Sequence, residues 1–177
     1  MLQKKKIFAI SGSTRASSAN LQILHAIADM YREKANFEIF NEINLLPHFN
    51  PDLDKDPLPD SVTSLRKKIE EADGVLICTP EYIFSLPGSL KNAIEWMVST
   101  TLFTNKPAAL ITAALSGQKA HESLNLVMRT VGVKLPENGT LLISTPKTKI
   151  STDGVITDEP TLMAIVELMD AFIQIIP

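Results

Sequence analysis

The sequence predicts an α/β fold in which helices cover both faces of one doubly wound parallel sheet. Strand-like apolar runs alternate with amphipathic helix patterns five times along the chain, and this alternation is typical of a parallel sheet. The run Gly74–Thr79 is almost continuously apolar, as expected of a strand buried on both faces. No repeat, linker or low-complexity segment interrupts the pattern, so we expect a single domain over residues 1–177.

The expected elements follow in chain order. The strands are Lys6–Ser11, Phe37–Glu42, Gly74–Thr79, Ala108–Ala114 and Leu141–Ser144. The helices are Ser18–Lys34, Asp60–Ala72, Gly88–Thr100, Lys119–Val131 and Thr161–Ile176. The first strand is apolar over residues 7–10, and Ser17 or Ser18 is a suitable N-cap for the first helix. Right-handed crossovers restrict such a chain to a few doubly wound topologies.

The third helix has the clearest pattern. It begins near Pro87, a residue favoured in the first turn of a helix. Its apolar positions follow i, i+3, i+4 and i+7 spacing, at Leu90, Ala93, Ile94 and Met97. The last helix follows a long loop and is opened by Thr157 or Asp158 as N-cap.

Composition describes an ordinary globular protein and limits its partners. The chain is 45% hydrophobic and 21% charged, with a net charge of −3, which gives no support for a nucleic-acid or membrane partner. The apolar stretch after Lys6 is too short for a secretory signal, and no run reaches transmembrane length. The single cysteine, Cys78, excludes an internal disulfide and is expected to be an inert core thiol. We therefore expect a cytoplasmic protein.

The loop after the first strand has the composition of an anion site. Residues 11–20 carry four serines, a threonine, an asparagine and Arg15, directly before a helix. The amides of a helix N-terminus, hydroxyls and a guanidinium all suit a phosphate group. The alternative is a serine-capped helix with a solvated Arg15. Because neither a G-x-G-x-x-G pattern nor a P-loop lysine is present, a phosphate on a ligand smaller than a dinucleotide fits better.

Other polar groups are weaker candidates. Asp52, Asp54 and Asp56 have calcium-loop spacing, but the sixth position is Pro57 and the twelfth is Thr63, so a solvated loop is the better interpretation. The three histidines, His25, His48 and His121, are scattered without metal-ligand spacing, and we expect no metal site. Glu81 is a possible proton donor, although no second carboxylate is near it in sequence.

Two segments together resemble the NADPH-dependent FMN reductases of flavodoxin-like fold, which include quinone, chromate and azo reductases. The first segment carries Gly12-Ser13-x-Arg15-x-x-Ser18-x-Asn20. The second carries Pro80-Glu81-Tyr82 and then Ser85-x-Pro87-Gly88-x-Leu90-Lys91-Asn92-Ala93-Ile94-x-Trp96. A shorter element, Leu46-Pro47-x-Phe49-Asn50-Pro51-Asp52, lies between them.

The resemblance implies strand order 2-1-3-4-5 and a set of site residues. Those expected to hold the FMN phosphate are Ser13, Arg15, Ser18 and Asn20. Those expected to line the flavin ring are Pro80, Glu81, Tyr82 and Ile83. A third loop, residues 115–119, is expected to close over the ring edge through Ser116 and Gly117. Two positions depart from the family: Ile83 replaces an asparagine, and the third loop has only one glycine.

The resemblance also implies the reaction. NADPH or NADH would reduce bound FMN, which would pass electrons to a small acceptor such as a quinone, an azo or nitro compound, a metal oxyanion or free flavin. The catalytic chemistry would belong to the flavin. The alternative is a flavodoxin-type electron carrier without NAD(P)H oxidase activity, and a degenerate, inactive member of the family also remains open.

Two apolar surfaces favour a homodimer or homotetramer. Trp96 lies off the apolar stripe of its helix, so it should be a partly exposed ring or an interface anchor. The last helix is apolar nearly all round, which suggests a second buried face.

Overall fold

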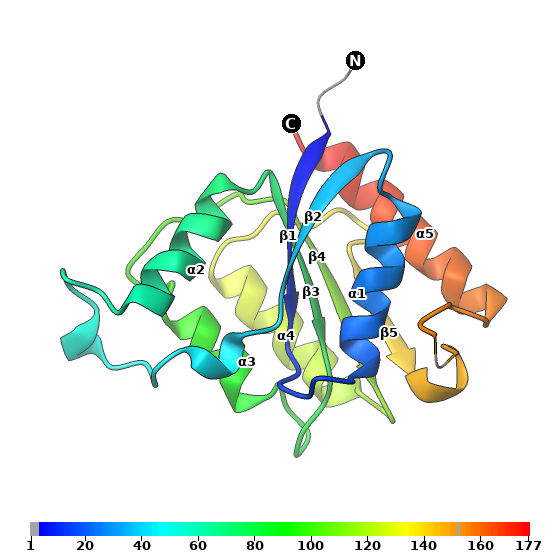
Figure 1. Cartoon of the computed structure of the whole chain (residues 1–177), viewed down its shortest axis with the longest axis horizontal. Coiled ribbons are helices and arrows are strands. Elements are labelled where there is room, and N and C mark those ends of the chain that lie inside the picture. Colours follow the sequence, from blue (N-terminus) through cyan, green and yellow to red (C-terminus); the bar gives the residue numbers. More distant parts are fainter. Residues whose placement is uncertain (1–3, 152) are drawn as a thin grey trace.

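The computed structural model describes residues 4–151 and 153–177, which form a five-stranded parallel sheet in the order β2-β1-β3-β4-β5 (Figure 1). The strands are β1 (Lys5–Ser11), β2 (Ala35–Phe40), β3 (Gly74–Thr79), β4 (Ala108–Ala114) and β5 (Thr140–Ser144). The helices are α1 (Ala19–Met30), α2 (Asp60–Glu71), α3 (Gly88–Glu95), α4 (Gln118–Thr130) and α5 (Glu159–Ile175). The expected flavodoxin-like fold and strand order are confirmed.

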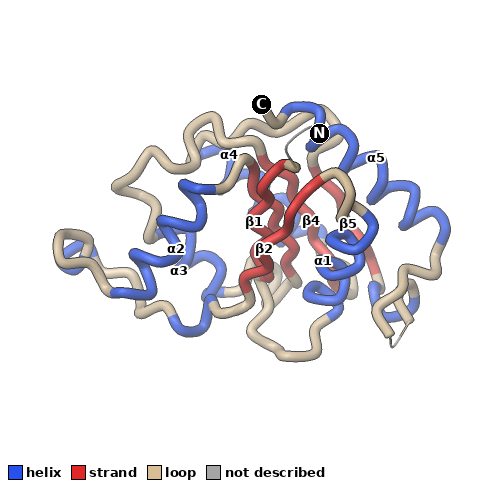
Figure 2. The backbone as a smooth tube through the Cα atoms, turned by 45° about the horizontal axis from the view of Figure 1, so that its top comes forward, coloured by secondary structure: helices blue, strands red, loops and turns tan. Residues whose placement is uncertain are grey.

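Helices cover the sheet on both sides, as the tube view also shows (Figure 2). One hydrophobic core packs α2, α3 and α4 against one face, and a second packs α1 and α5 against the other. Every residue of β3 and β4 is buried, and neighbouring side chains of β3 alternate between the cores. Val75 and Ile77 enter the first core, whereas Leu76 and Cys78 enter the second. The continuous apolar runs therefore belong to the two central, doubly covered strands.

The structure identifies the N-cap residues of α1 and α5. Of the alternatives, Ser18 caps α1, because its Oγ accepts a 3.1 Å hydrogen bond from the Leu21 amide. Asp158 caps α5 by accepting a 3.1 Å bond from the Thr161 amide.

Some element boundaries differ from those expected. Strand β2 begins two residues early, at Ala35, where it pairs with Lys5 of β1. Helix α3 ends at Glu95 rather than at residue 100. The guanidinium of Arg66 donates two hydrogen bonds, of 3.0 and 2.5 Å, to the Trp96 carbonyl. That carbonyl therefore has a side-chain partner in place of the next helical amide.

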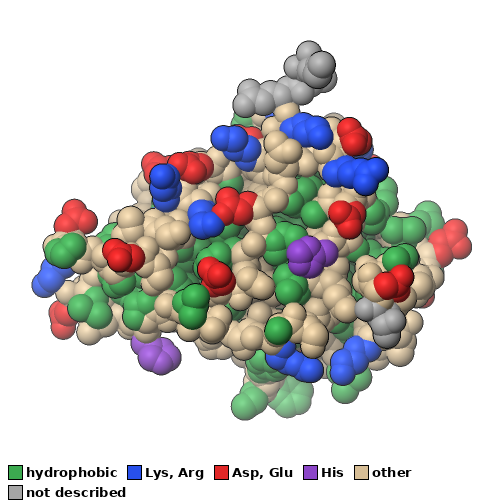
Figure 3. Space-filling model, viewed as in Figure 1, with side chains coloured by type: hydrophobic (Ala, Val, Ile, Leu, Met, Phe, Trp, Pro, Cys, Tyr) green, Lys and Arg blue, Asp and Glu red, His purple; other side chains and the backbone are tan. Residues whose placement is uncertain are grey.

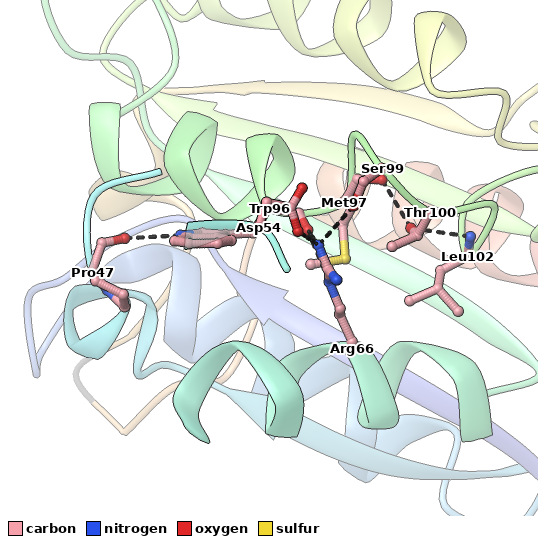
Figure 4. A network of polar contacts seen from close by, with 8 residues as sticks. All are labelled: Pro47, Asp54, Arg66, Trp96, Met97, Ser99, Thr100 and Leu102. Carbon is pink, nitrogen blue, oxygen red and sulfur yellow. Dashed lines mark hydrogen bonds and ion pairs between the residues drawn. The ribbon is translucent and has the colours of Figure 1, made fainter. Parts of the chain in front are cut away.

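The prediction that Trp96 is partly exposed or anchors an interface is wrong (Figure 4). Its side chain is 0% exposed. The indole N–H donates to the Pro47 carbonyl at 2.8 Å, and the ring meets Phe49 edge-on at 5.2 Å. The loop of residues 41–59 packs over this side of α3 and buries the Trp96 ring. A helical wheel of α3 alone does not include this loop, so it could not predict the burial.

The apolar character of α5 is also accounted for largely within the chain. Its residues Ile165, Leu168, Met169 and Phe172 are buried in the second core. Its exposed large apolar side chains are Met163 and Val166. The two observations behind the expected oligomer therefore no longer support it.

Candidate functional site

The carboxyl ends of β1 and β3 approach closely, and their loops leave toward opposite faces of the sheet. Gly12 follows β1, and a Cβ on it would overlap the side chain of Thr79, the last residue of β3. Only glycine allows this approach. Strand β1 continues into α1 on one face and β3 into α3 on the other, which opens a crevice of the kind that binds ligands in doubly wound sheets.

A cavity of about 440 Å³ occupies this crevice, which is within the usual range for small-molecule sites. Its walls come from four loops at the carboxyl edge of the sheet. The lining residues are Ser13, Arg15, Ser17, Ser18, Ala19, Asn20, Pro80, Glu81, Tyr82, Ala113, Ala114, Leu115, Thr145, Pro146, Lys147 and Thr148. The structure thus brings seven of the ten expected site residues together; Ile83, Ser116 and Gly117 do not line the cavity.

Hydroxyl groups and one cation gather at the N-terminus of α1. The Oγ atom of Ser13 accepts a 3.3 Å bond from the Arg15 amide, which folds the loop back on itself. Ser18 Oγ accepts the capping bond of α1, and its own O–H hydrogen can still be donated to a ligand. Arg15 is exposed, and no ion pair involving it is found within residues 4–151 and 153–177. This donor set fits a phosphate monoester.

Asn20 has a structural task at the cavity wall. Its side chain is buried, donates to the Ala113 carbonyl at 3.3 Å and accepts from the Cys78 thiol at 3.3 Å. It therefore joins α1 to β3 and β4. Cys78 is fully buried, and burial raises the pKa of its thiol, which agrees with an inert core residue.

The β3–α3 loop (residues 80–87) contains a tight turn that directs two apolar side chains away from the protein. Tyr82 and Ser85 exchange backbone hydrogen bonds of 3.0 and 3.1 Å. Between them, Ile83 and Phe84 both have positive φ, at 50° and 55°, a pair that defines a type I′ turn. Ile83 is 96% exposed. Hydrophobic side chains protrude at this end of the molecule (Figure 3).

Glu81 points from this loop toward the start of α4. Its carboxylate accepts bonds from the amides of Ala120 at 3.0 Å and Gly117 at 3.2 Å, and from the Ser116 hydroxyl at 3.1 Å. The bond from Ala120, followed by the others, lowers the pKa of Glu81 against the opposing effect of burial. The carboxylate is engaged as the acceptor of three hydrogen bonds, and both these bonds and the lowered pKa argue against Glu81 as a proton donor.

The fourth wall of the cavity, residues 145–148, was not among the expected site residues. They follow β5, with Thr145 at a φ of 49° and Pro146–Thr148 in a short 3₁₀ helix. Lys147 is exposed and adds a second cation to the cavity. The strand order could have predicted this wall. Because β5 lies next to β4 and all parallel strands end at the same edge of the sheet, the loop after β5 must lie beside the other three loops.

Other candidates are not part of the site. His121 Nδ1 lies 3.2 Å from Thr112 Oγ1, and burial lowers the pKa of the ring. Asp54 pairs with Arg66 at 2.6 Å, and the described residues contain no metal-ligand cluster. None of the helices in residues 4–151 and 153–177 has the length and hydropathy needed to cross a membrane.

Known proteins support this architecture. Residues 5–147 match the family model of NADPH-dependent FMN reductase. A 2-hydroxy-1,4-benzoquinone reductase from Burkholderia sp is 32% identical over 173 residues, which is 94% of this chain and 93% of that protein. An NAD(P)H:quinone oxidoreductase from Solanum tuberosum is 35% identical, over 88% and 84%.

A solved structure agrees with these sequence matches. FerB, a flavoenzyme NAD(P)H:(acceptor) oxidoreductase from Paracoccus denitrificans, superposes with a TM-score of 0.79 and 31% identity over 97% of each chain. With the fold, the cavity and these matches in agreement, the chain belongs to the family of NADPH-dependent FMN reductases.

Proposed function

We propose that this enzyme binds FMN in the four-walled cavity and transfers hydride from NADPH or NADH, through the flavin, to a small acceptor. The observation that carries the proposal is the division of the cavity into two ends. A cationic, hydroxyl-rich end at α1 suits a phosphate, and an end walled by Pro80, Tyr82 and Leu115 suits a planar aromatic ring.

The residues at the two ends would have different tasks. Arg15 would make a charge-assisted bond to the phosphate, and the Ser13 and Ser18 hydroxyls would donate to its oxygens. The apolar walls would orient the ring and exclude water from it. Bound FMN would supply the hydride-accepting and electron-transferring chemistry. The lack of a dinucleotide motif suits a nicotinamide that docks briefly and departs before the acceptor enters.

A quinone is the acceptor class we favour. The Burkholderia and Solanum relatives are both named for quinone reduction, and the Paracoccus protein for reduction of an unspecified acceptor. Azo and nitro compounds, metal oxyanions and free flavin are the other classes. A reducing cytoplasm suits a chain whose one cysteine is a buried thiol.

Steady-state kinetics test this function. One flavin that serves two substrates in turn gives ping-pong kinetics, so double-reciprocal plots at several fixed benzoquinone concentrations should be parallel. Intersecting lines would require a separate nicotinamide site. An electron carrier would show no turnover with either nicotinamide.

We also propose that the chain forms a homodimer or homotetramer, on different grounds from those given by the sequence. A groove of about 470 Å³ between α3 and α4 is lined mainly by apolar side chains, among them Phe49, Ile94 and Val127. Val98 and Leu126 on its walls are exposed. Contiguous exposed apolar surface of this kind favours association.

A further inference from the structure

We propose that Glu81 is a positioning residue that clamps the β4–α4 loop (residues 115–117) against the β3–α3 loop. These loops carry Leu115 and Tyr82, which line the aromatic end of the cavity from two sides. The inference rests on the proposed function only where it concerns flavin binding. The clamp itself is a feature of the protein without ligand.

Helix α4 has no capping side chain of its own. Its N-cap position is Gly117, which has a φ of 83° and makes no side-chain cap bond. A Cβ at this position would lie 2.8 Å from Leu142, so a serine or aspartate cap does not fit there. The first amides of a helix need acceptors, and a negative charge beside them is favourable. The Glu81 carboxylate meets both needs from a loop 36 residues earlier in the chain.

The clamp is the direct polar connection between the two loops. Within the described part of the chain, the hydrogen bonds that join residues 80–87 to residues 115–120 are the three accepted by Glu81. One carboxylate oxygen receives Ser116 Oγ and the Gly117 amide, and the other receives the Ala120 amide. Ser116 and Gly117, which do not line the cavity themselves, thus act through Glu81.

Among the charged groups around the clamp, Glu81 is the carboxylate that contacts the first amides of α4. On α4, Lys119 pairs with Glu122 at 2.7 Å, and His121 contacts Thr112. Arg15 and Lys147 lie on other walls of the cavity. Because the folded-state pKa of Glu81 is lowered, the clamp is intact above the ordinary carboxyl pKa of about 4.3 and is lost as the pH falls through the lowered value.

The substitution Glu81→Gln tests the clamp with little change in shape. Glutamine has one acceptor oxygen and no charge, so it cannot replace both sides of the carboxylate. We expect affinity for FMN and for riboflavin to fall by the same factor, about tenfold, because the aromatic end is disturbed and the phosphate end is not. Glu122→Gln is the matched control, since it removes an exposed carboxylate from the same helix, and its flavin affinity should equal that of the wild type.

Two further measurements separate the clamp from flavin binding. Hydrogen exchange of the Gly117 and Ala120 amides in flavin-free protein should accelerate in Glu81→Gln and not in Glu122→Gln. Riboflavin affinity should fall in wild type as the pH is lowered from about 4.3 through the lowered pKa of Glu81, and this loss should be absent in Glu81→Gln. Unchanged amide exchange in Glu81→Gln, or identical pH profiles, would overturn the clamp.

If wild type binds no flavin, the proposed function fails, and the exchange measurement still decides the clamp. If Glu81→Gln does not fold, Glu81→Asp, whose shorter side chain withdraws the charge from the amides, should give the same exchange result.

Discussion

The indole N–H of Trp96 donates a 2.8 Å hydrogen bond to the carbonyl oxygen of Pro47. This bond ties the end of α3 to a loop that is otherwise short of regular structure. Arg66 reinforces the same junction, because its guanidinium binds both the Trp96 carbonyl and the Asp54 carboxylate (Figure 4). The aspartate-rich loop is therefore fixed to the protein through Asp54.

Trp96→Phe should destabilise the protein. Phenylalanine keeps much of the apolar packing but removes one of the two donors to the Pro47 carbonyl, which still accepts a 3.0 Å bond from the Asn92 side chain. The loss of one hydrogen bond costs about 0.5–1.5 kcal/mol. Urea unfolding followed by circular dichroism measures the change. Tyr82→Phe, which removes a polar group from an exposed aromatic side chain, is the control and should change the free energy of unfolding by less than about 0.5 kcal/mol. Equal stability of both variants would contradict a supporting role for this bond.

Arg15→Ala should weaken FMN binding and leave riboflavin binding unchanged. A hydrogen bond from a charged group contributes about 1.5–3 kcal/mol, so the Kd for FMN should rise about ten- to a hundredfold. Fluorescence titration with both flavins measures this. Arg129→Ala removes an exposed cation from the far end of α4 and should bind FMN as the wild type does. A parallel loss of riboflavin affinity in Arg15→Ala would mean that Arg15 does not hold the phosphate.

Ile83→Asn should stabilise the protein. A β-branched residue at a φ of 50° is strained, whereas asparagine tolerates the left-handed region. We expect a gain of about 1 kcal/mol in the free energy of unfolding. Val98→Asn, at an exposed apolar position outside that region, should give no such gain. A loss of stability in Ile83→Asn would show that its side chain makes favourable contacts beyond the single chain.

Light scattering should give a multiple of the 19.4 kDa chain mass at micromolar concentration. Leu126→Lys should lower that mass, because it places a charge at the exposed edge of the α3–α4 groove. Leu53→Lys, at another exposed leucine in the 41–59 loop, should not. A wild-type mass of 19.4 kDa would remove the proposed oligomer.

The strands and helices could be predicted from the sequence because they depend on local patterns, whereas the strand order followed from the family resemblance. The runs of β3 and β4, the serines before α1 and the Pro80–Tyr82 segment are all readable within a few residues. Contacts between distant loops are not. The burial of Trp96 depends on residues 41–59, which have no periodicity, and the clamp joins Glu81 to amides more than 30 residues away. Neither a helical wheel nor the spacing of a motif describes contacts between segments that are far apart in the sequence.

Reduction of the bound flavin is the most direct test of the proposed function. Protein loaded with FMN and freed of excess flavin is mixed anaerobically with NADPH or NADH. We expect the oxidised-flavin absorption to disappear within the time of one catalytic turnover and to return when benzoquinone is added. If neither nicotinamide bleaches the flavin, the chain is not an NAD(P)H-dependent reductase.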